Sequence, residues 1–333
     1  MTLRGAIVGF GEVARNGHWP AWAACSGARI VAVVDRTPER RALVASLAPA
    51  IETFATLDEL ASAMPIDFVD ICTPPALHHE PMLDAITRGW HVLCEKPFLL
   101  DPIVLDVVRR LAADRGVAVL PVHNWKHAPI IRRATETLLA GAIGPLRRVE
   151  IETCRIREAV GADPARPDWR RDSAIAGGGI LMDHGWHAVY LALHWFGRPA
   201  IGVRASLHRP LEGGVDDEAS VTIEFPDGVA TIALTWNGDE RRNTIRLSGA
   251  RGTVVIADDT LHVRGTHDES IRFARALSDG SHHDDWFAAM LPTVVSAFQN
   301  PALAGPSFEE AAQCLSIIQQ AYRPDPSLAA PPR

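Results

Sequence analysis

The first third of the chain alternates short apolar runs with stretches of helical character. Five runs stand out: Ala6–Gly9, Ile30–Val34, Phe68–Cys72, His91–Cys94 and Val117–Val122. Between them, helix-like segments begin near Glu12, Pro38, Leu57, Leu77 and Asp101. Continuous apolar runs that alternate with helices are typical of a parallel sheet covered on both faces. The pattern predicts an α/β domain with a doubly wound parallel sheet.

From about Pro145 the apolar residues alternate strictly with polar ones. Segment 221–225 puts its apolar side chains on one face, Pro226-Asp-Gly turns the chain, and segment 232–236 repeats the alternation. This predicts an antiparallel hairpin with one buried face. Further strands are expected at 146–154, 200–207, 244–248, 253–256 and 261–263, and helices near 181–196, 284–298 and 308–321. The second part is therefore expected to be an α+β domain with a large, mostly antiparallel sheet.

Composition narrows the class of protein. A length of 333 residues fits about two domains, and the net charge of −7 argues against nucleic acid or an anionic membrane as the main partner. The longest uncharged stretch, 286–308, contains three prolines, so no membrane span is expected. The five cysteines lack metal spacing and the N-terminus lacks a signal-peptide core, so we expect reduced thiols and a cytoplasmic location.

A glycine-rich turn follows the first predicted strand. It consists of Gly9, Phe10, Gly11, Glu12, Val13 and Ala14. The first glycine permits a tight turn, the second lets the backbone approach a pyrophosphate, and the small Ala14 permits close packing of helix on strand. Asp35 ends the next strand, where a carboxylate can bind the ribose hydroxyls of a dinucleotide. This motif predicts an NAD(P)-binding Rossmann domain over residues 1–122, followed by a domain for substrate binding and oligomerisation over 123–333, whose closing helices can pack back on the first.

The choice between NAD and NADP depends on two neighbouring residues. Asp35 would repel the 2′-phosphate of NADP, which favours NAD as the cofactor. Arg36 could instead stack on the adenine or neutralise that phosphate, so NADP stays possible.

Two further stretches carry a family resemblance. One is Cys72-Thr-Pro-Pro-Ala-Leu-His78 followed by Glu95-Lys96-Pro97, and the other is Trp169-Arg170 followed by Gly177-Gly-Gly-Ile-Leu-Met-Asp183-His-Gly-Trp-His187. Together with the glycine turn, they resemble the glucose–fructose oxidoreductase / inositol dehydrogenase / MocA (Gfo/Idh/MocA) family of NAD(P)-dependent sugar and cyclitol oxidoreductases. The resemblance covers the Rossmann part and the start of the second domain.

The resemblance implies a set of site residues. The cofactor would contact the glycine turn, Asp35 and Arg36, and also Thr73, Pro75, His78, Glu95, Lys96, Trp169 and Arg170. The catalytic residues would be Lys96, Asp183 and His187. The family often has an acid three residues after the motif histidine, where this chain has Tyr190, so the resemblance leaves the substrate's identity open. Asn124 and Lys126, after the last Rossmann strand, together with Tyr190, complete the expected substrate contacts.

The residue chemistry points the same way. Asp183 and His187 are four apart in a predicted helix, so both can face one side. A carboxylate beside an imidazole orients it and raises its basicity, which suits a base that takes the proton of a secondary alcohol. A lysine ammonium beside the same oxygen would stabilise developing negative charge. The roles of Lys96 and His187 could be exchanged.

The expected function is hydride transfer between nicotinamide and a hydroxyl or ketone of a sugar, cyclitol or related polyol. Two alternatives stay open: a glycoside hydrolase that uses transient oxidation, and a non-catalytic sugar-sensing regulator. We expect a homodimer or homotetramer formed through the second domain's sheet. Because the histidine clusters lack a metal-ligand spacing such as HExxH, no metal is expected.

Overall fold

The structure is a computed structural model that describes residues 2–159 and 168–323. The chain divides into two compact units. The first extends to His127 and includes residues 282–312, and the second includes residues 128–159, 170–281 and 313–323. The boundary at residue 122 stays a prediction. One sheet of each expected kind is present.

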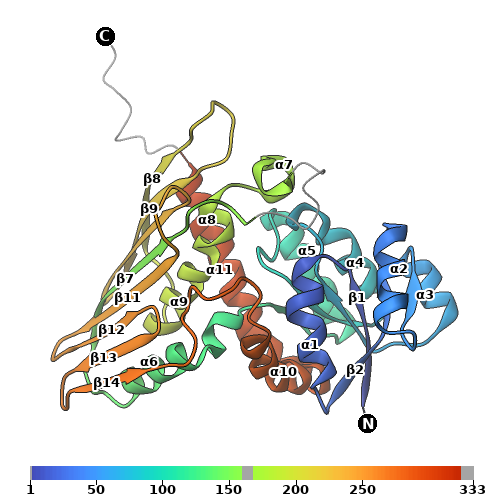
Figure 1. The fold of residues 1–333 in the computed structure, drawn as a ribbon, viewed down its shortest axis with the longest axis horizontal. Helices are drawn as coiled ribbons and strands as arrows, with labels where there is room; N and C mark the ends of the chain where they lie inside the picture. The colour runs from blue at the N-terminus through green and yellow to red at the C-terminus, as the bar shows by residue number, and fades with distance from the viewer. Residues whose placement is uncertain (1, 160–167, 324–333) are drawn as a thin grey trace. The chain divides into compact units, whose positions relative to one another are not determined.

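Sheet A is parallel and has the strand order β3-β2-β1-β4-β5-β6 (Figure 1). Its strands are β1 (Leu3–Val8), β2 (Ala28–Val34), β3 (Glu52–Phe54), β4 (Phe68–Ile71), β5 (His91–Cys94) and β6 (Val119–Pro121). The order reverses between β1 and β4, and in doubly wound sheets ligands bind at the carboxyl ends of the strands at such a switch point. The glycine turn follows β1, so it lies at this point.

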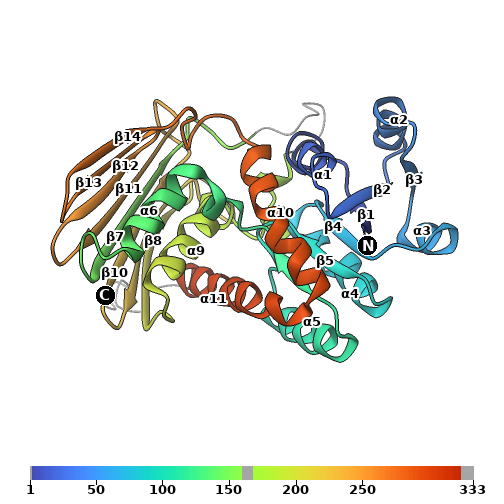
Figure 2. The same ribbon diagram turned by 90° about the horizontal axis from the view of Figure 1, so that it is seen from below.

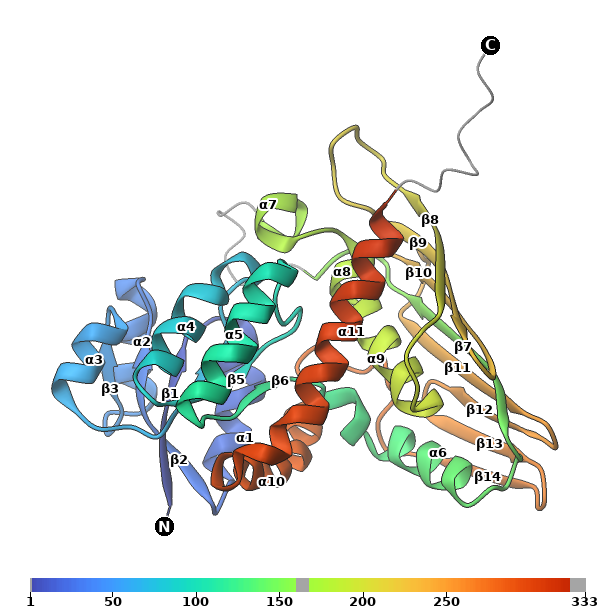
Figure 3. The ribbon, with the colours of Figure 1, turned by 180° about the vertical axis from the view of Figure 1, so that it is seen from behind.

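Helices flank sheet A, and Figure 3 shows α4 and α5 side by side across it. The helices of this unit are α1 (Trp19–Ala23), α2 (Pro38–Leu47), α3 (Leu57–Ala63), α4 (His79–Thr87), α5 (Pro102–Arg115) and α10 (Asp284–Gln299), with 3₁₀ turns η2 (Pro75–Leu77), η3 (Asn124–His127) and η5 (Pro301–Ala304). The expected cap of α5 is confirmed, because the Asp101 carboxylate accepts the N–H of Ile103 at 2.8 Å. The ring of Phe68 packs on Trp22 and Phe298 at 4.9 and 5.1 Å. A side chain on Gly5 would overlap this ring, which explains the glycine inside β1.

Sheet B has the strand order β14-β13-β12-β11-β7-β10-β9-β8 (Figure 2). Its strands are β7 (Leu146–Cys154), β8 (Gly202–His208), β9 (Glu218–Phe225), β10 (Gly228–Thr235), β11 (Arg242–Gly249), β12 (Thr253–Ala257), β13 (Thr260–Arg264) and β14 (Glu269–Arg272). All pairings are antiparallel except that of β7 with β10. The predicted hairpin is confirmed, because Phe225 pairs with Gly228 across the turn.

Three helices of the second unit cover one face of sheet B (Figure 3). They are α6 (Pro129–Leu139), α8 (Ile180–Asp183) and α9 (Gly185–Phe196). The second unit also contains α7 (Ser173–Ala176), and α11 (Gly305–Tyr322) passes from the first unit into the second. The single helix expected over 181–196 is wrong, because α8 ends at Asp183 and α9 begins at Gly185. Among the described residues, no helix is long and apolar enough to cross a membrane. The five cysteines are free thiols.

Candidate functional site

The glycine turn after β1 has the geometry that a dinucleotide needs. Gly9 has φ +87°, and a Cβ there would lie 2.9 Å from the side chain of Thr73, so both its conformation and its surroundings require glycine. A Cβ on Gly11 would meet no atom within 4 Å, so the space above this backbone is open. Ala14 is fully buried, as close packing of helix on strand requires. These residues fit a pyrophosphate that approaches the turn along the backbone N–H groups.

The carboxylate of Asp35 closes the same turn from the end of β2. Its Oδ2 accepts the N–H of Phe10 at 2.7 Å, and its Oδ1 accepts the N–H of Thr37 at 2.8 Å. Arg40 lies 3.4 Å from Oδ2, whereas the Arg36 side chain is 84% exposed and lies 3.8 Å from Glu80. Asp35 therefore shapes the cofactor turn and also places a negative charge beside it.

We expect Asp35→Ser to raise the ratio of NADP to NAD turnover by about tenfold or more, because the charge that repels a 2′-phosphate is removed. Asp35→Asn removes the same charge but keeps a side-chain oxygen that can accept the Phe10 N–H. It therefore separates the loss of charge from the loss of this hydrogen bond. The ratio of kcat/KM for the two cofactors measures the effect. An unchanged ratio in both variants would show that Arg36 and its neighbours already decide the preference.

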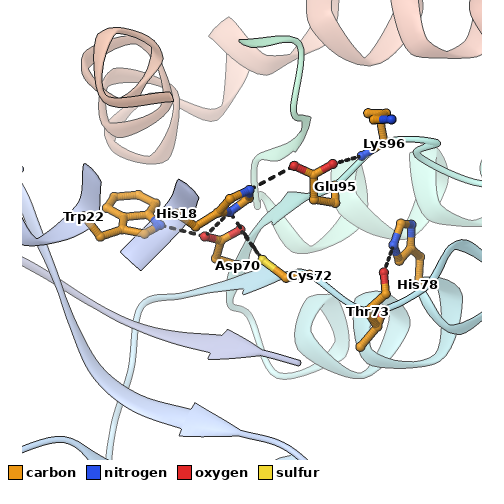
Figure 4. A network of polar contacts seen from close by, with 8 residues as sticks. All are labelled: His18, Trp22, Asp70, Cys72, Thr73, His78, Glu95 and Lys96. Carbon is orange, nitrogen blue, oxygen red and sulfur yellow. Dashed lines mark hydrogen bonds and ion pairs between the residues drawn. The ribbon is translucent and has the colours of Figure 1, made fainter. Parts of the chain in front are cut away.

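The loop after β4 and the motif after β5 are joined by one histidine. His78 Nε2 donates to the carbonyl of Thr73 at 2.7 Å, and its Nδ1 lies 3.0 Å from the carbonyl oxygen of Pro97 (Figure 4 shows the first contact). The Lys96–Pro97 peptide bond is cis. Burial lowers the pKa of His78. His78 is thus buried and links two loops at the carboxyl edge of sheet A, and its contact with the cofactor stays a prediction.

A buried network of charged groups lies behind Lys96 (Figure 4). His18 Nδ1 lies 2.8 Å from Asp70 Oδ2, and His18 Nε2 lies 2.9 Å from Glu95 Oε1. The second oxygen of Glu95 accepts the backbone N–H of Lys96 at 2.9 Å. Sequence reasoning missed Asp70, because it stands inside an apolar run that reads as an ordinary strand.

In the second unit, Asp183 and His187 lie on either side of the break between α8 and α9. The Asp183 carboxylate lies 3.5 Å from His184 Nδ1 and 4.0 Å from Arg170 Nε. His187 is buried, and its Nδ1 lies 2.9 Å from the hydroxyl of Tyr190. Tyr190, which was expected to contact the substrate, is fully buried beside this ring, and its substrate contact stays a prediction.

The glycines before Asp183 are explained by a buried carboxylate that sequence reasoning missed. Asp216 accepts the N–H groups of Gly179 and Leu181, both at 2.9 Å, and the hydroxyl of Tyr322 at 2.7 Å. A Cβ on Gly179 would lie 1.8 Å from the backbone oxygen of Asp216, and one on Gly178 would lie 2.1 Å from the Tyr322 hydroxyl. The triple glycine therefore lets Asp216 approach α8, and this contact fixes the segment that carries Asp183.

We expect Gly179→Ala to lower the free energy of unfolding by about 1–3 kcal/mol, because the added methyl overlaps the Asp216 backbone. Gly305→Ala is the matched control, since its Cβ would meet no atom within 4 Å. Urea unfolding followed by circular dichroism measures both. Equal stability of the two variants would show that the close approach at Gly179 is not needed.

The segment after β6 is tied to α11 within the first unit. His123 Nδ1 lies 2.7 Å from Glu310 Oε1, and Lys126 forms an ion pair with the same carboxylate. Burial raises the pKa of Glu310, but the hydrogen bond from His123 and the charge of Lys126 outweigh it and lower the pKa to about 2. Asn124 Oδ1 is buried and makes no hydrogen bond within the described residues. Of the two expected substrate contacts here, Lys126 thus has a structural partner, and Asn124 keeps an acceptor to offer.

Three buried donors occur at one end of the face of sheet B that the helices cover. Arg155 Nε, Trp236 Nε1 and Asn243 Nδ2 make no hydrogen bond within the described residues. Arg155 is 3% exposed, and its remaining nitrogens donate to the carbonyls of Cys154 and Arg242 and to the Asn243 side chain. Burial lowers the pKa of Arg155 to about 10, while the charge of Asp183 acts to raise it. Arg155 therefore adds positive charge near Asp183, which no motif of the sequence indicates.

The two units together have the components of a nicotinamide-dependent oxidoreductase. The first unit carries a parallel sheet with the glycine turn at its switch point and Lys96 at the same edge. The second unit carries Asp183, His187 and Tyr190. Residues 3–123 match the model of an oxidoreductase family with an NAD-binding Rossmann fold, and residues 131–255 match the GFO/IDH/MocA C-terminal domain. The chain belongs to the Gfo/Idh/MocA family of NAD(P)-binding oxidoreductases.

Named relatives agree with this assignment. The chain is 29% identical to scyllo-inositol 2-dehydrogenase (NADP⁺) IolU of Bacillus subtilis over 234 residues, which are 70% of this chain and 69% of that protein. It is 28% identical to levoglucosan dehydrogenase of Pseudarthrobacter phenanthrenivorans over 237 residues, which are 62% of this chain and 60% of that protein.

Solved structures show the same fold. An oxidoreductase from Agrobacterium radiobacter, in complex with NAD⁺, L-tartaric acid and magnesium, aligns over 97% of this chain and 96% of its own with a TM-score of 0.85 at 19% identity. GenD2 from gentamicin A biosynthesis, in complex with NAD, aligns over 96% of this chain and 93% of its own with a TM-score of 0.81 at 26% identity.

Proposed function

We propose that the protein oxidises a secondary or anomeric hydroxyl of a monosaccharide, cyclitol or related polyol, or reduces the matching ketone, with NAD as the preferred cofactor. The observation that carries the proposal is that Lys96 follows β5 at the edge of sheet A where the glycine turn follows β1. The named relatives act on scyllo-inositol and levoglucosan, which are both polyhydroxylated rings.

The proposed chemistry separates the hydride from the proton. The nicotinamide, when bound, accepts the hydride from the carbon that carries the hydroxyl. His187 takes the hydroxyl proton, and the Tyr190 hydroxyl, which lies 2.9 Å from its Nδ1, orients the ring. The Lys96 ammonium stabilises negative charge that develops on the same oxygen, and Asp183 anchors the substrate and orients it. In the reverse direction the same groups return the proton to the ketone oxygen.

A substrate screen tests this function. Aldoses, inositols and sugar acids are each incubated with NAD or NADP, and the absorbance of the reduced nicotinamide is followed. We expect turnover with at least one polyol and a preference for NAD. If free sugar is released from a glycoside without net reduction of NAD, the protein is instead a hydrolase that uses transient oxidation. If the cofactor binds and no substrate in either class reacts, the proposed function is wrong.

The assembly and location of the protein belong to the same proposal. In the β8–β10 part of sheet B, buried and more exposed positions alternate, so one face is left for a second copy of the chain. We propose a cytoplasmic homodimer or homotetramer that assembles through this sheet. Light scattering coupled to size-exclusion chromatography distinguishes both forms from a monomer.

A further inference from the structure

A histidine between two buried carboxylates is the feature of the first unit that the proposed chemistry does not use. His18 is 1% exposed, Asp70 is fully buried and Glu95 is 8% exposed. Both ring nitrogens lie within hydrogen-bond distance of a carboxylate oxygen, at 2.8 Å for Asp70 and 2.9 Å for Glu95. A neutral imidazole has one N–H, so it can donate to only one of them. The contact geometry therefore requires a ring that carries both protons whenever both carboxylates are ionised.

The balance of charge supports the same protonation state. An unpaired ion inside a protein is costly, so buried charges occur in pairs. A negative Asp70, a positive His18, a negative Glu95 and a positive Lys96 alternate along the network. Burial lowers the pKa of His18, but its interactions with Asp70 and Cys72 together outweigh this effect, and the pKa is raised well above 6.5. Burial raises the pKa of Glu95, yet the hydrogen bond and charge of His18 lower it below its usual value.

The surroundings hold the His18 ring in one orientation. The indole Nε1 of Trp22 donates to Asp70 Oδ2 at 2.7 Å, which leaves this carboxylate fixed from two sides. The ring of Phe287 stacks on His18 with centroids 3.9 Å apart. Cys72 Sγ lies 3.3 Å from His18 Nδ1, and burial raises the pKa of this thiol to about 12. The network is therefore a rigid support rather than a surface ion pair.

The backbone places His18 there by an uncommon route. The glycine turn leads into η1 (Ala14–His18), which is a π-helix whose last residue is His18. π-helical turns are rare and occur often at functional sites. At the end of this turn, His18 contacts Asp70 on β4 and Glu95 after β5. The segment that begins at the glycine turn thus ends at His18, which contacts the Glu95 carboxylate next to Lys96.

We propose that His18 is a positioning residue for Lys96. His18 holds Glu95 ionised and fixed, and Glu95 in turn accepts the backbone N–H of Lys96 at 2.9 Å (Figure 4). The direction of Lys96 at the edge of sheet A therefore depends on His18, which touches neither cofactor nor substrate. This inference rests on the proposed role of Lys96 in hydride transfer.

Steady-state kinetics tests the proposal through a split between kcat and cofactor affinity. His18→Leu removes both donors, and we expect kcat to fall at least about tenfold, as loss of a charge-assisted hydrogen bond would give, while the Kd for NAD changes less than about threefold. His18→Gln keeps one donor and should recover part of kcat. His267→Gln, at an exposed position between β13 and β14, is the matched control. A fall in NAD affinity equal to the fall in kcat would show a merely structural role and overturn the proposal.

A double-mutant cycle and a spectrum test the two links separately. If His18 acts through Glu95, the His18→Leu/Glu95→Gln double variant should lose no more than the worse single variant, whereas additive losses in kcat would refute the link. In wild-type protein labelled with ¹⁵N-histidine, the His18 ring should carry both protons at pH 7.5, with the signal assigned by its loss in His18→Gln. A ring with one proton would overturn the proposal. Because the spectrum needs no turnover, it tests the protonation state of His18 even if the proposed reaction is wrong.

Discussion

Replacement of Lys96 by Met should lower kcat by about 10²- to 10³-fold, which is the usual loss when a charged group is removed from the oxygen that develops charge. The Kd for NAD should change far less, because the turn at Gly9 and Gly11 and the carboxylate of Asp35 are untouched. Stopped-flow absorbance of the reduced nicotinamide, together with a fluorescence titration of the cofactor, measures both quantities.

A second variant separates two roles for this lysine. Lys96→Arg keeps the positive charge but cannot give up a proton near neutral pH. If Lys96 only polarises the oxygen, the arginine variant should retain more activity than Lys96→Met. If Lys96 relays the proton, both variants should be equally slow. Arg148→Met, an exposed change on β7, is the control, and full turnover in Lys96→Met would refute the assignment of this residue.

Replacement of His187 by Ala should lower kcat by about 10²- to 10⁴-fold, the range expected when a general base is lost. The effect should be concentrated on the chemical step, so the isotope effect with substrate deuterated at the reacting carbon should rise. Added imidazole should restore part of the activity, because the deleted ring leaves space beside Tyr190.

The matched control for His187 lies on the same helix. His194→Gln changes an exposed position of α9, and its kcat should stay near the wild-type value. Tyr190→Phe removes the hydroxyl that holds Nδ1 and should give an intermediate loss. If His187→Ala is as fast as wild type, the proton is assigned to Lys96 instead. The same assignment follows if imidazole does not change the rate of His187→Ala while Lys96→Met is inactive.

Local periodicity was sufficient to predict both sheets. Strand β5 was expected to the residue and β4 to within one residue, because each buries a continuous apolar set. The hairpin of β9 and β10 was expected from its alternating apolar set, but these strands begin three and four residues before the predicted segments. The sequence prediction left β3 and β14 unassigned, since three or four residues at a sheet edge carry little periodicity. It also left α6 unassigned, although its apolar positions recur at helical spacing after Pro129.

The buried polar contacts could not be predicted, because their partners are far apart in the sequence. His18 meets residues 52 and 77 positions later, and Asp216 meets Gly179 from 37 positions away. Nothing in the local pattern at Asp70 distinguishes it from an exposed strand residue. The motifs identified which glycines and histidines matter, whereas the carboxylates that hold them became visible only in three dimensions.

Almost all basic residues of the chain are arginines, and very few are lysines. Lysine and arginine number 33 in total, yet only Lys96 and Lys126 are lysines. A reagent that acylates amines and spares guanidinium groups can therefore modify only these two side chains, and Lys126 is engaged with Glu310. Mass spectrometry of the peptide that contains Lys96, with and without NAD, would follow events at the proposed active-site lysine without any engineered label.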